Sequence, residues 1–109
     1  MEIGKLYQIK KYVWYLYPSK ETAAHASRRH AAADALHSDP SEAAYYSELW
    51  SKQFDCNVSY ISENSIFCLI GNNGKLLKVL SANGELGWIS YPQDEEWTKG
   101  CIEEVKEHA

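Results

Sequence analysis

The chain has 109 residues, of which 45% are hydrophobic and 24% charged, which suits one domain with one core and excludes a largely disordered chain. Its formal net charge is −4, and residues 55–109 carry the acidic excess, with nine acidic against four basic residues. Nucleic-acid-binding proteins usually present a basic face, so this acidic half argues against that function. No apolar run approaches the ~20 residues of a membrane span and no signal peptide opens the chain, so we expect a cytoplasmic protein.

Residues 4–17 are rich in aromatic and β-branched side chains, which predicts two strands with a bend near Lys10-Lys11. The core residues expected in these strands are Leu6, Ile9, Val13 and Leu16. The alanine-rich segment 20–37 has high helix propensity but little apolar surface to bury. We expect it to form a surface helix.

A second helix begins at Pro40, because Asp39 is suited to the N-cap position and proline to the first helical turn. Apolar side chains recur along this helix at the spacing of one face, which predicts that the face packs on the core. They are Ala43, Tyr46, Leu49, Trp50 and Phe54.

Short apolar runs alternate with turns after residue 55. We expect strands at about 56–61, 65–70, 75–81 and 85–90, and a short closing strand within 97–105. The pairs Asn73-Gly74 and Asn83-Gly84 predict type I′ hairpin turns, in which both central residues have positive φ. Consecutive hairpins of this kind are typical of a small barrel or sandwich.

The segment that ends at Ile89, GKLLKVLSANGELGWI, resembles the distal hairpin and following strand of bacterial SH3-type domains, with Gly84, Gly87 and Trp88 at the motif positions. We expect Gly87 to allow close approach of neighbouring backbones and Trp88 to cover the core. The chain is also similar to short SH3-like proteins of tailed phages, cyanobacterial ones among them.

The resemblance and the order of elements together imply one α+β domain, mainly β, over residues 1–109. The expected fold is an SH3-like barrel of about five strands from residues 1–18 and 55–106, with a two-helix insertion at 20–54.

Aromatic side chains provide the best candidate for a binding site. In an SH3-like barrel the strand at 12–17 lies near the loop after the Gly-Trp strand, so Tyr15, Tyr17, Tyr91 and Trp97 are candidates for the lining of a shallow groove. Alternation along the strand predicts that Tyr15 and Tyr17 share a face opposite Trp14. The alternative is that these aromatic residues complete a small core.

Catalytic and metal-binding patterns are weak. His30, Asp34 and His37 lie at helical spacing on one face, but a structural zinc site usually has four ligands, and a solvated helix explains the pattern as well. No histidine is linked by a motif to the cysteines, whose expected role is that of small hydrophobic residues: Cys56, Cys68 and Cys101. We therefore expect no enzyme, no metal and no cofactor.

These observations favour a non-enzymatic binding or adaptor protein that acts through contacts with a protein or peptide, in the host cytoplasm if a phage encodes it. The alternative is a nucleic-acid-binding SH3-like barrel, in which Lys10, Lys11, Arg28 and Arg29 contact phosphates beside stacking tyrosines. The sequence leaves open the identity of the partner and whether the protein forms a homo-oligomer.

Overall fold

The computed structural model describes residues 1–29, 40–92 and 96–106, and shows a compact mixed α+β chain in which strands predominate. Helices α1 (Lys20–Arg29) and α2 (Pro40–Phe54) lie between the second and third strands of the chain. The strands are β1 (Leu6–Ile9), β2 (Trp14–Leu16), β3 (Ser59–Ile61), β4 (Ile66–Asn73), β5 (Leu76–Ser81), β6 (Leu86–Ser90) and β7 (Ile102–Glu104). A short 3₁₀ helix, η2 (Glu96–Thr98), precedes β7.

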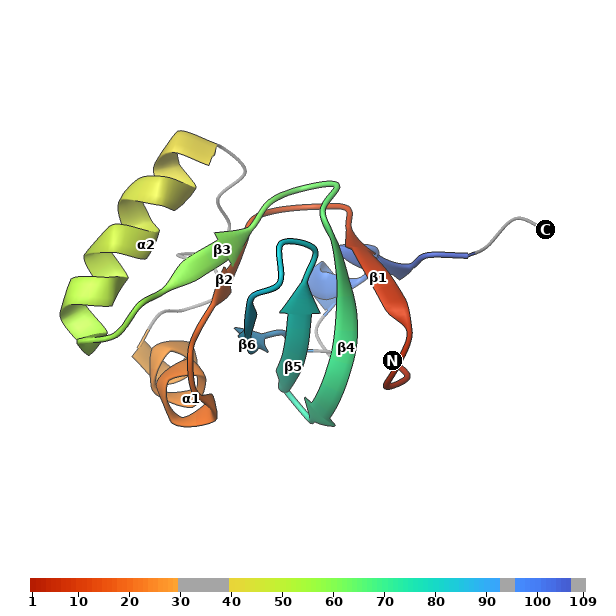
Figure 1. The fold of residues 1–109 in the computed structure, drawn as a ribbon, viewed down its shortest axis with the longest axis horizontal. Coiled ribbons are helices and arrows are strands. Elements are labelled where there is room, and N and C mark those ends of the chain that lie inside the picture. Colours follow the sequence, from red (N-terminus) through yellow and green to blue (C-terminus); the bar gives the residue numbers. More distant parts are fainter. Residues whose placement is uncertain (30–39, 93–95, 107–109) are drawn as a thin grey trace.

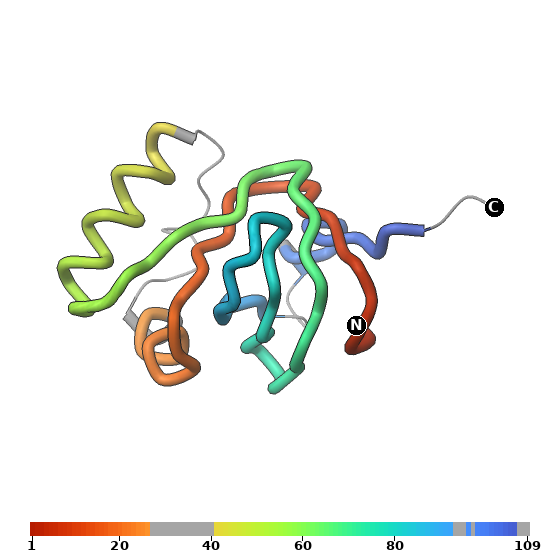
Figure 2. Tube along the Cα trace, in the orientation of Figure 1, coloured from red at the N-terminus to blue at the C-terminus, as the bar shows by residue number. Residues whose placement is uncertain are grey.

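The strands form a five-stranded antiparallel sheet, in the order β6-β5-β4-β1-β7, and a separate antiparallel pair, β2-β3 (Figure 1). The chain passes from the first sheet to the second at Tyr12, where φ is 68°. Figure 2 shows this crossing beside the turn between β3 and β4. The Tyr12 amide donates a hydrogen bond to the carboxylate of Glu63, which lies in that turn (3.2 Å). The bend predicted near Lys10-Lys11 is confirmed, and it lies at Tyr12.

The main core fills the space between the two sheets, because both sheets turn alternate side chains toward it. Trp14 and Leu16 enter it from β2, and the rings of Trp14 and Tyr91 meet edge to face with their centroids 5.1 Å apart. The strands β4, β5 and β6 contribute five fully buried side chains, and Ile9 of β1 is buried to the same extent; the five are Phe67, Leu69, Leu77, Val79 and Ile89.

The residue after β2 joins the second sheet to β6 through a single pair of backbone hydrogen bonds. The Tyr17 amide donates to the Trp88 carbonyl and the Trp88 amide donates to the Tyr17 carbonyl, each at 2.8 Å. A Cβ atom at Gly87 would lie 2.7 Å from Cγ of Leu16 and 2.8 Å from the Tyr17 carbonyl oxygen. The close backbone approach expected at Gly87 is therefore confirmed, and only glycine fits there without a shift of its neighbours.

Both helices cover a second apolar cluster, on the side of β2 that points away from the main core. The Trp50 ring of α2 lies edge-on to the Tyr15 ring, with centroids 4.3 Å apart. The hydroxyl of Ser51 accepts a hydrogen bond from the Val58 amide (2.8 Å), which ties α2 to the segment that leads into β3. The helix ends at Phe54, and the next residue, Asp55, has a left-handed φ of 50°.

Helix α1 begins at a cap in which the Ser19 hydroxyl accepts a hydrogen bond from the Thr22 amide (3.1 Å). It packs on β5 and β6 through small buried residues, among them Ala23 and Ala26. Figure 1 shows α1 and α2 gathered beside β2 and β3, while the N-terminus lies on the other side of the molecule near β1. The expected N-cap of α2, Asp39, lies outside the described residues.

Three core assignments differ from the prediction. Leu6 is 48% exposed, because Tyr7 and Ile9 of the same strand face inward and alternation turns Leu6 outward. Leu49 of α2 is 42% exposed. Trp88 lies half-buried in the helix-covered cluster rather than over the main core.

Both predicted hairpins are present, but neither turn is type I′, because only one residue in each has positive φ. Gly74 (φ 64°) and Lys75 connect β4 to β5. Between β5 and β6, Gly84 (φ 89°) follows two turn residues, and its amide donates to the Ser81 carbonyl (3.0 Å). Ser81 and Glu85 lie opposite one another, and the three residues between them have the form of a type I turn followed by a left-handed glycine.

We expect Gly87→Ala to lower the free energy of unfolding by about 1–3 kcal/mol, because the added methyl group would overlap Leu16 and the Tyr17 carbonyl. Urea denaturation followed by tryptophan fluorescence measures this loss, with Ser90→Ala in the same strand as the control. If the two variants had equal stability, the close approach at Gly87 would be refuted.

Candidate contact surface

The structure places the tyrosines of the predicted groove inside the protein. Tyr15 and Tyr17 are buried in the helix-covered cluster, whereas Tyr91 is buried in the main core. Trp97 belongs to η2, but its side chain lies outside the described residues. The three tyrosines therefore lie in two separate clusters and do not line one exposed groove. The predicted shared face of Tyr15 and Tyr17, opposite Trp14, is confirmed.

Burial of these tyrosines changes their ionisation. Desolvation raises the pKa of Tyr17 and of Tyr15 well above the ordinary value, because a phenolate would lose its hydration under the helices. Desolvation also raises the pKa of Tyr91, whose hydroxyl donates a hydrogen bond to the Thr98 carbonyl (2.8 Å). Thr98 is buried as well, and its hydroxyl donates to the Pro92 carbonyl (2.8 Å), so this pair anchors the segment that leads to β7.

Two sets of side chains in the part of the chain that the structure describes bear on metal and thiol chemistry. That part contains no group of three His, Cys, Asp or Glu residues able to hold a metal ion. The residues of the candidate metal face, His30, Asp34 and His37, lie outside it. Burial raises the pKa values of Cys56 and Cys101, which disfavours the reactive thiolate. Cys56, predicted to lie in a strand, instead precedes β3.

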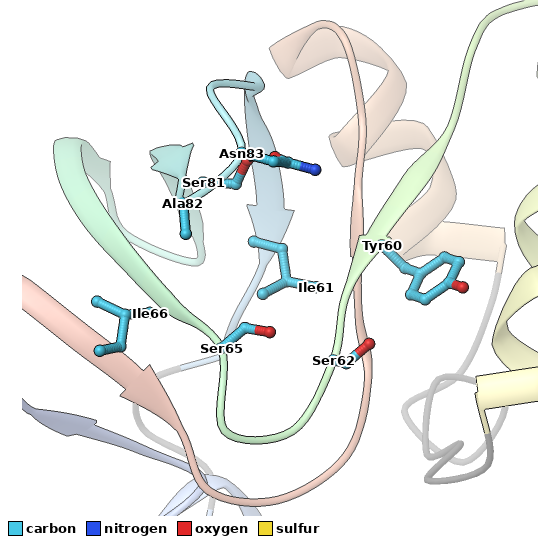
Figure 3. Close-up of a pocket in the computed structure, with 8 residues that line it drawn as sticks. All are labelled: Tyr60, Ile61, Ser62, Ser65, Ile66, Ser81, Ala82 and Asn83. Atoms are coloured by element: carbon cyan, nitrogen blue, oxygen red, sulfur yellow. The ribbon is translucent and has the colours of Figure 1, made fainter.

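A hollow of about 240 Å³ lies between the β3–β4 turn and the β5–β6 turn (Figure 3). Figure 3 shows Ile61 pointing between Ser65 and Ser81, while the Tyr60 ring points away. The lining is uncharged: Tyr60, Ile61, Ser62, Ser65, Ile66, Ser81, Ala82 and Asn83. Small-molecule sites usually enclose ~300–1,000 Å³, so this hollow is small for one and lacks an acid or base.

Of the four basic residues named for nucleic-acid binding, the structure describes the side chains of two. Lys10 and Lys11 are exposed at the end of β1, and the side chains of Arg28 and Arg29 lie outside the described residues. Lys5 contacts two carboxylates, Glu2 at 3.0 Å and Glu104 at 3.1 Å, which raise its pKa.

A row of apolar side chains crosses the outer face of the five-stranded sheet. Leu6 of β1 pairs with Cys68 of β4, Cys68 with Leu80 of β5, and Leu80 with Leu86 of β6. Because neighbouring strands are about 4.8 Å apart, the row extends about 14 Å across the sheet. Ile70, the extra residue where the β4–β5 register shifts, adds a fifth side chain beside it. We call these five residues the apolar patch.

Exposure distinguishes the apolar patch from the other large apolar side chains of the sheet. Leu86 is 55% exposed, Leu6 48%, Ile70 39% and Leu80 38%, and Cys68 is half-buried. Full burial of one such aliphatic side chain contributes about 1.5–3 kcal/mol, so covering the patch would stabilise a complex appreciably. Because these exposed apolar side chains are contiguous, the patch is a candidate contact surface.

The patch begins where the cover provided by α1 ends. Along β5, Leu76 is buried in the cluster under the helices, whereas Leu80, four residues on and facing the same way, is exposed. Along β6, Trp88 is half-buried in that cluster and Leu86 is exposed. Between the covered and the exposed residues of β5 lies Lys78, whose ammonium group is 6.0 Å from the centroid of the Trp88 ring. The outer face is therefore covered at one end and open at the other.

Sequence reasoning missed this surface, although a signal was present. In β5 the residues LLKVL are apolar on both faces of the strand, apart from Lys78. Such a strand needs cover on both sides. The sequence alone does not reveal which residues of neighbouring strands pair, and this pairing is what aligns Leu80 with residues of three other strands.

Comparison with models of protein families, with curated proteins and with solved structures found no match to the chain. Within the described residues, no helix combines the length and the apolar character needed to cross a membrane.

The buried hydroxyl of Tyr17 predicts a loss of stability in alkali. Since the folded state raises the pKa of Tyr17 above the ordinary value of 10.0, its neutral form contributes stability in full below about pH 10. Above that pH the unfolded chain ionises first, and the contribution falls by about 1.4 kcal/mol per pH unit until the folded pKa is reached. Urea denaturation between pH 8 and about pH 11.5 measures this decline.

The variant Tyr17→Phe isolates the effect, because it removes only the hydroxyl. We expect its stability to fall less steeply above pH 10 than that of the unmodified protein, whereas Tyr45→Phe, at an exposed position of α2, follows the unmodified protein. Parallel curves for Tyr17→Phe and the unmodified protein would contradict the burial of Tyr17.

Proposed function

We propose that the chain is a non-enzymatic protein-binding domain with an SH3-like barrel, and that its contact surface is the apolar patch. The observation that carries this proposal is the row of four paired side chains, Leu6, Cys68, Leu80 and Leu86, which leaves aliphatic surface in water across four strands. A surface of this kind favours binding because its cover removes apolar area from water.

Two features support the SH3-like assignment. The strands β1 and β2 form one bent segment shared by two sheets, and the helices are inserted directly after it, as the resemblance implies. Gly87 and Trp88 occupy the strand that receives the end of β2. The likeness to phage-encoded SH3-like proteins stays a prediction.

The chemistry of the described residues also favours binding over catalysis. The pKa shifts have structural causes: an ion pair for Glu2 and Lys5, and burial for the tyrosines and thiols. The acidic character of residues 55–109 makes a protein a better-suited partner than a nucleic acid.

Affinity capture tests the proposal. The tagged protein is incubated with a nuclease-treated bacterial lysate that also contains an untagged copy of the chain, beside the variants Leu80→Glu and Leu49→Glu. These two leucines have similar exposure, but Leu49 lies on α2, away from the patch. We expect a stoichiometric protein, whether another protein or the untagged copy, that Leu80→Glu loses and Leu49→Glu retains.

Circular dichroism and thermal unfolding check that both variants remain folded. Capture that survives Leu80→Glu would refute the apolar patch as the contact surface. Recovery of nucleic acid alone, when the nuclease is left out, would support the nucleic-acid-binding alternative instead.

A further inference from the structure

We infer that Asn73 is a site of spontaneous deamidation in the folded protein, and that the turn between β5 and β6 protects Asn83 from the same reaction. Both residues precede glycine and both are exposed, so access of water does not distinguish them. Their hydrogen bonds do. The site lies outside the apolar patch and is independent of the function proposed for that surface.

Deamidation begins when the backbone nitrogen of the following residue attacks Cγ of the asparagine side chain. The new N–Cγ bond closes a cyclic succinimide, the bond between Cγ and Nδ2 breaks, and Nδ2 leaves as ammonia with the proton that the backbone amide has lost. Water then adds to one of the two ring carbonyls and opens the ring. The products are aspartate and isoaspartate, in which the main chain runs through Cβ and Cγ. Nothing is oxidised or reduced, and water is the only co-reactant.

A following glycine favours this attack. The chain has five asparagines, and only Asn73 and Asn83 precede glycine. Glycine has no Cβ atom to hinder the approach of its nitrogen to Cγ, and its backbone has more conformations available for ring closure. The sequence alone therefore predicts similar reactivity at the two sites.

The turn between β5 and β6 holds both reacting groups of Asn83-Gly84. The attacking nitrogen, that of Gly84, donates a hydrogen bond to the Ser81 carbonyl (3.0 Å). The side-chain oxygen of Asn83 accepts a hydrogen bond from the Ser81 hydroxyl, which lies beside it in Figure 3. That hydroxyl in turn accepts a hydrogen bond from the Glu85 amide (3.1 Å). Ring closure removes the amide proton of Gly84 and swings Cγ of Asn83 toward its nitrogen, so it has to break the first two of these bonds.

The side chain of Asn73 has no such restraint. Asn73 is the last residue of β4 and pairs with Leu76 across the turn Gly74-Lys75. Its side-chain amide makes no hydrogen bond to any residue that the structure describes. Rotation of this side chain therefore brings Cγ toward the Gly74 nitrogen without the loss of a side-chain hydrogen bond.

The two hairpins differ in what deamidation would change. Either product at Asn73 adds one negative charge to the formal net charge of −4. Isoaspartate also lengthens the main chain by one carbon atom, which disturbs the pairing of Asn73 with Leu76, a residue buried under the helices. Protection of Asn83 preserves the hairpin in which Leu80 pairs with Leu86.

Peptide mapping by mass spectrometry, after incubation of the purified full chain in mildly alkaline buffer, measures conversion at each asparagine. Trypsin separates the two sites, because Lys75 and Lys78 lie between them. The same incubation in urea gives the rates of the unfolded chain, which we expect to be similar at Asn73 and Asn83. In the folded protein we expect Asn83 to convert at least about tenfold more slowly than Asn73, equivalent to about 1.4 kcal/mol in the barrier, because two hydrogen bonds oppose its reaction.

The variant Ser81→Ala identifies the source of the protection, because it removes the hydroxyl that holds Asn83. We expect it to speed conversion at Asn83 by roughly two- to tenfold and to leave the rate at Asn73 unchanged. Ser90→Ala, in β6, should leave both rates unchanged. Circular dichroism checks that both variants remain folded.

Equal rates at the two sites of the folded protein would overturn the inference, as would faster conversion at Asn83 or no conversion at Asn73. A folded Ser81→Ala variant in which Asn83 converts no faster would also overturn it, because the Ser81 hydroxyl would then give no protection. The comparison of folded and unfolded rates uses the unmodified protein, so it decides the matter even if Ser81→Ala unfolds.

Discussion

The close approach of two backbones at Gly87 is the constraint on which the rest of the fold depends. Besides the covalent crossings and the shared core, the Ser59 hydroxyl of β3 donates a hydrogen bond to the Glu85 carboxylate beside β6. The two sheets also meet through two backbone hydrogen bonds between Tyr17 and Trp88. Those bonds form only because Gly87 leaves space for Leu16 and for the Tyr17 carbonyl. Because the two sheets are joined at Tyr17 and Trp88, the side chains between them form a closed core.

The contact between Tyr17 and β6 also determines which surfaces are covered. Tyr17 lies directly before the segment that leads into α1, so the position of this residue against β6 places α1 over one end of the outer sheet face. Leu76 and Trp88 lie in the cluster beneath the helices, and the face beyond them stays open. The apolar patch is thus a consequence of where the helical insertion ends, and its proposed role as a contact surface follows from that incomplete cover.

The local features of the fold were predictable from the sequence, and the long-range ones were not. Alternation placed Tyr15 and Tyr17 on one face, and the Asn-Gly pairs located both hairpins, because these features depend on neighbouring residues. The burial of Tyr17 and the exposure of Leu6 depend on which distant element covers each face. For the same reason, the predicted aromatic groove was replaced by the apolar patch, whose row arises from pairing across four strands.

Hydrogen exchange measured by NMR at the amides of Tyr17 and Trp88 tests the central claim most directly. If the bridge beside Gly87 joins the two sheets, both amides exchange only when the whole domain unfolds, with the same protection as the central amides of β5, such as that of Val79. Exchange of Tyr17 and Trp88 as fast as that of an unfolded chain would contradict the account, because the sheets would then separate without unfolding of the whole domain.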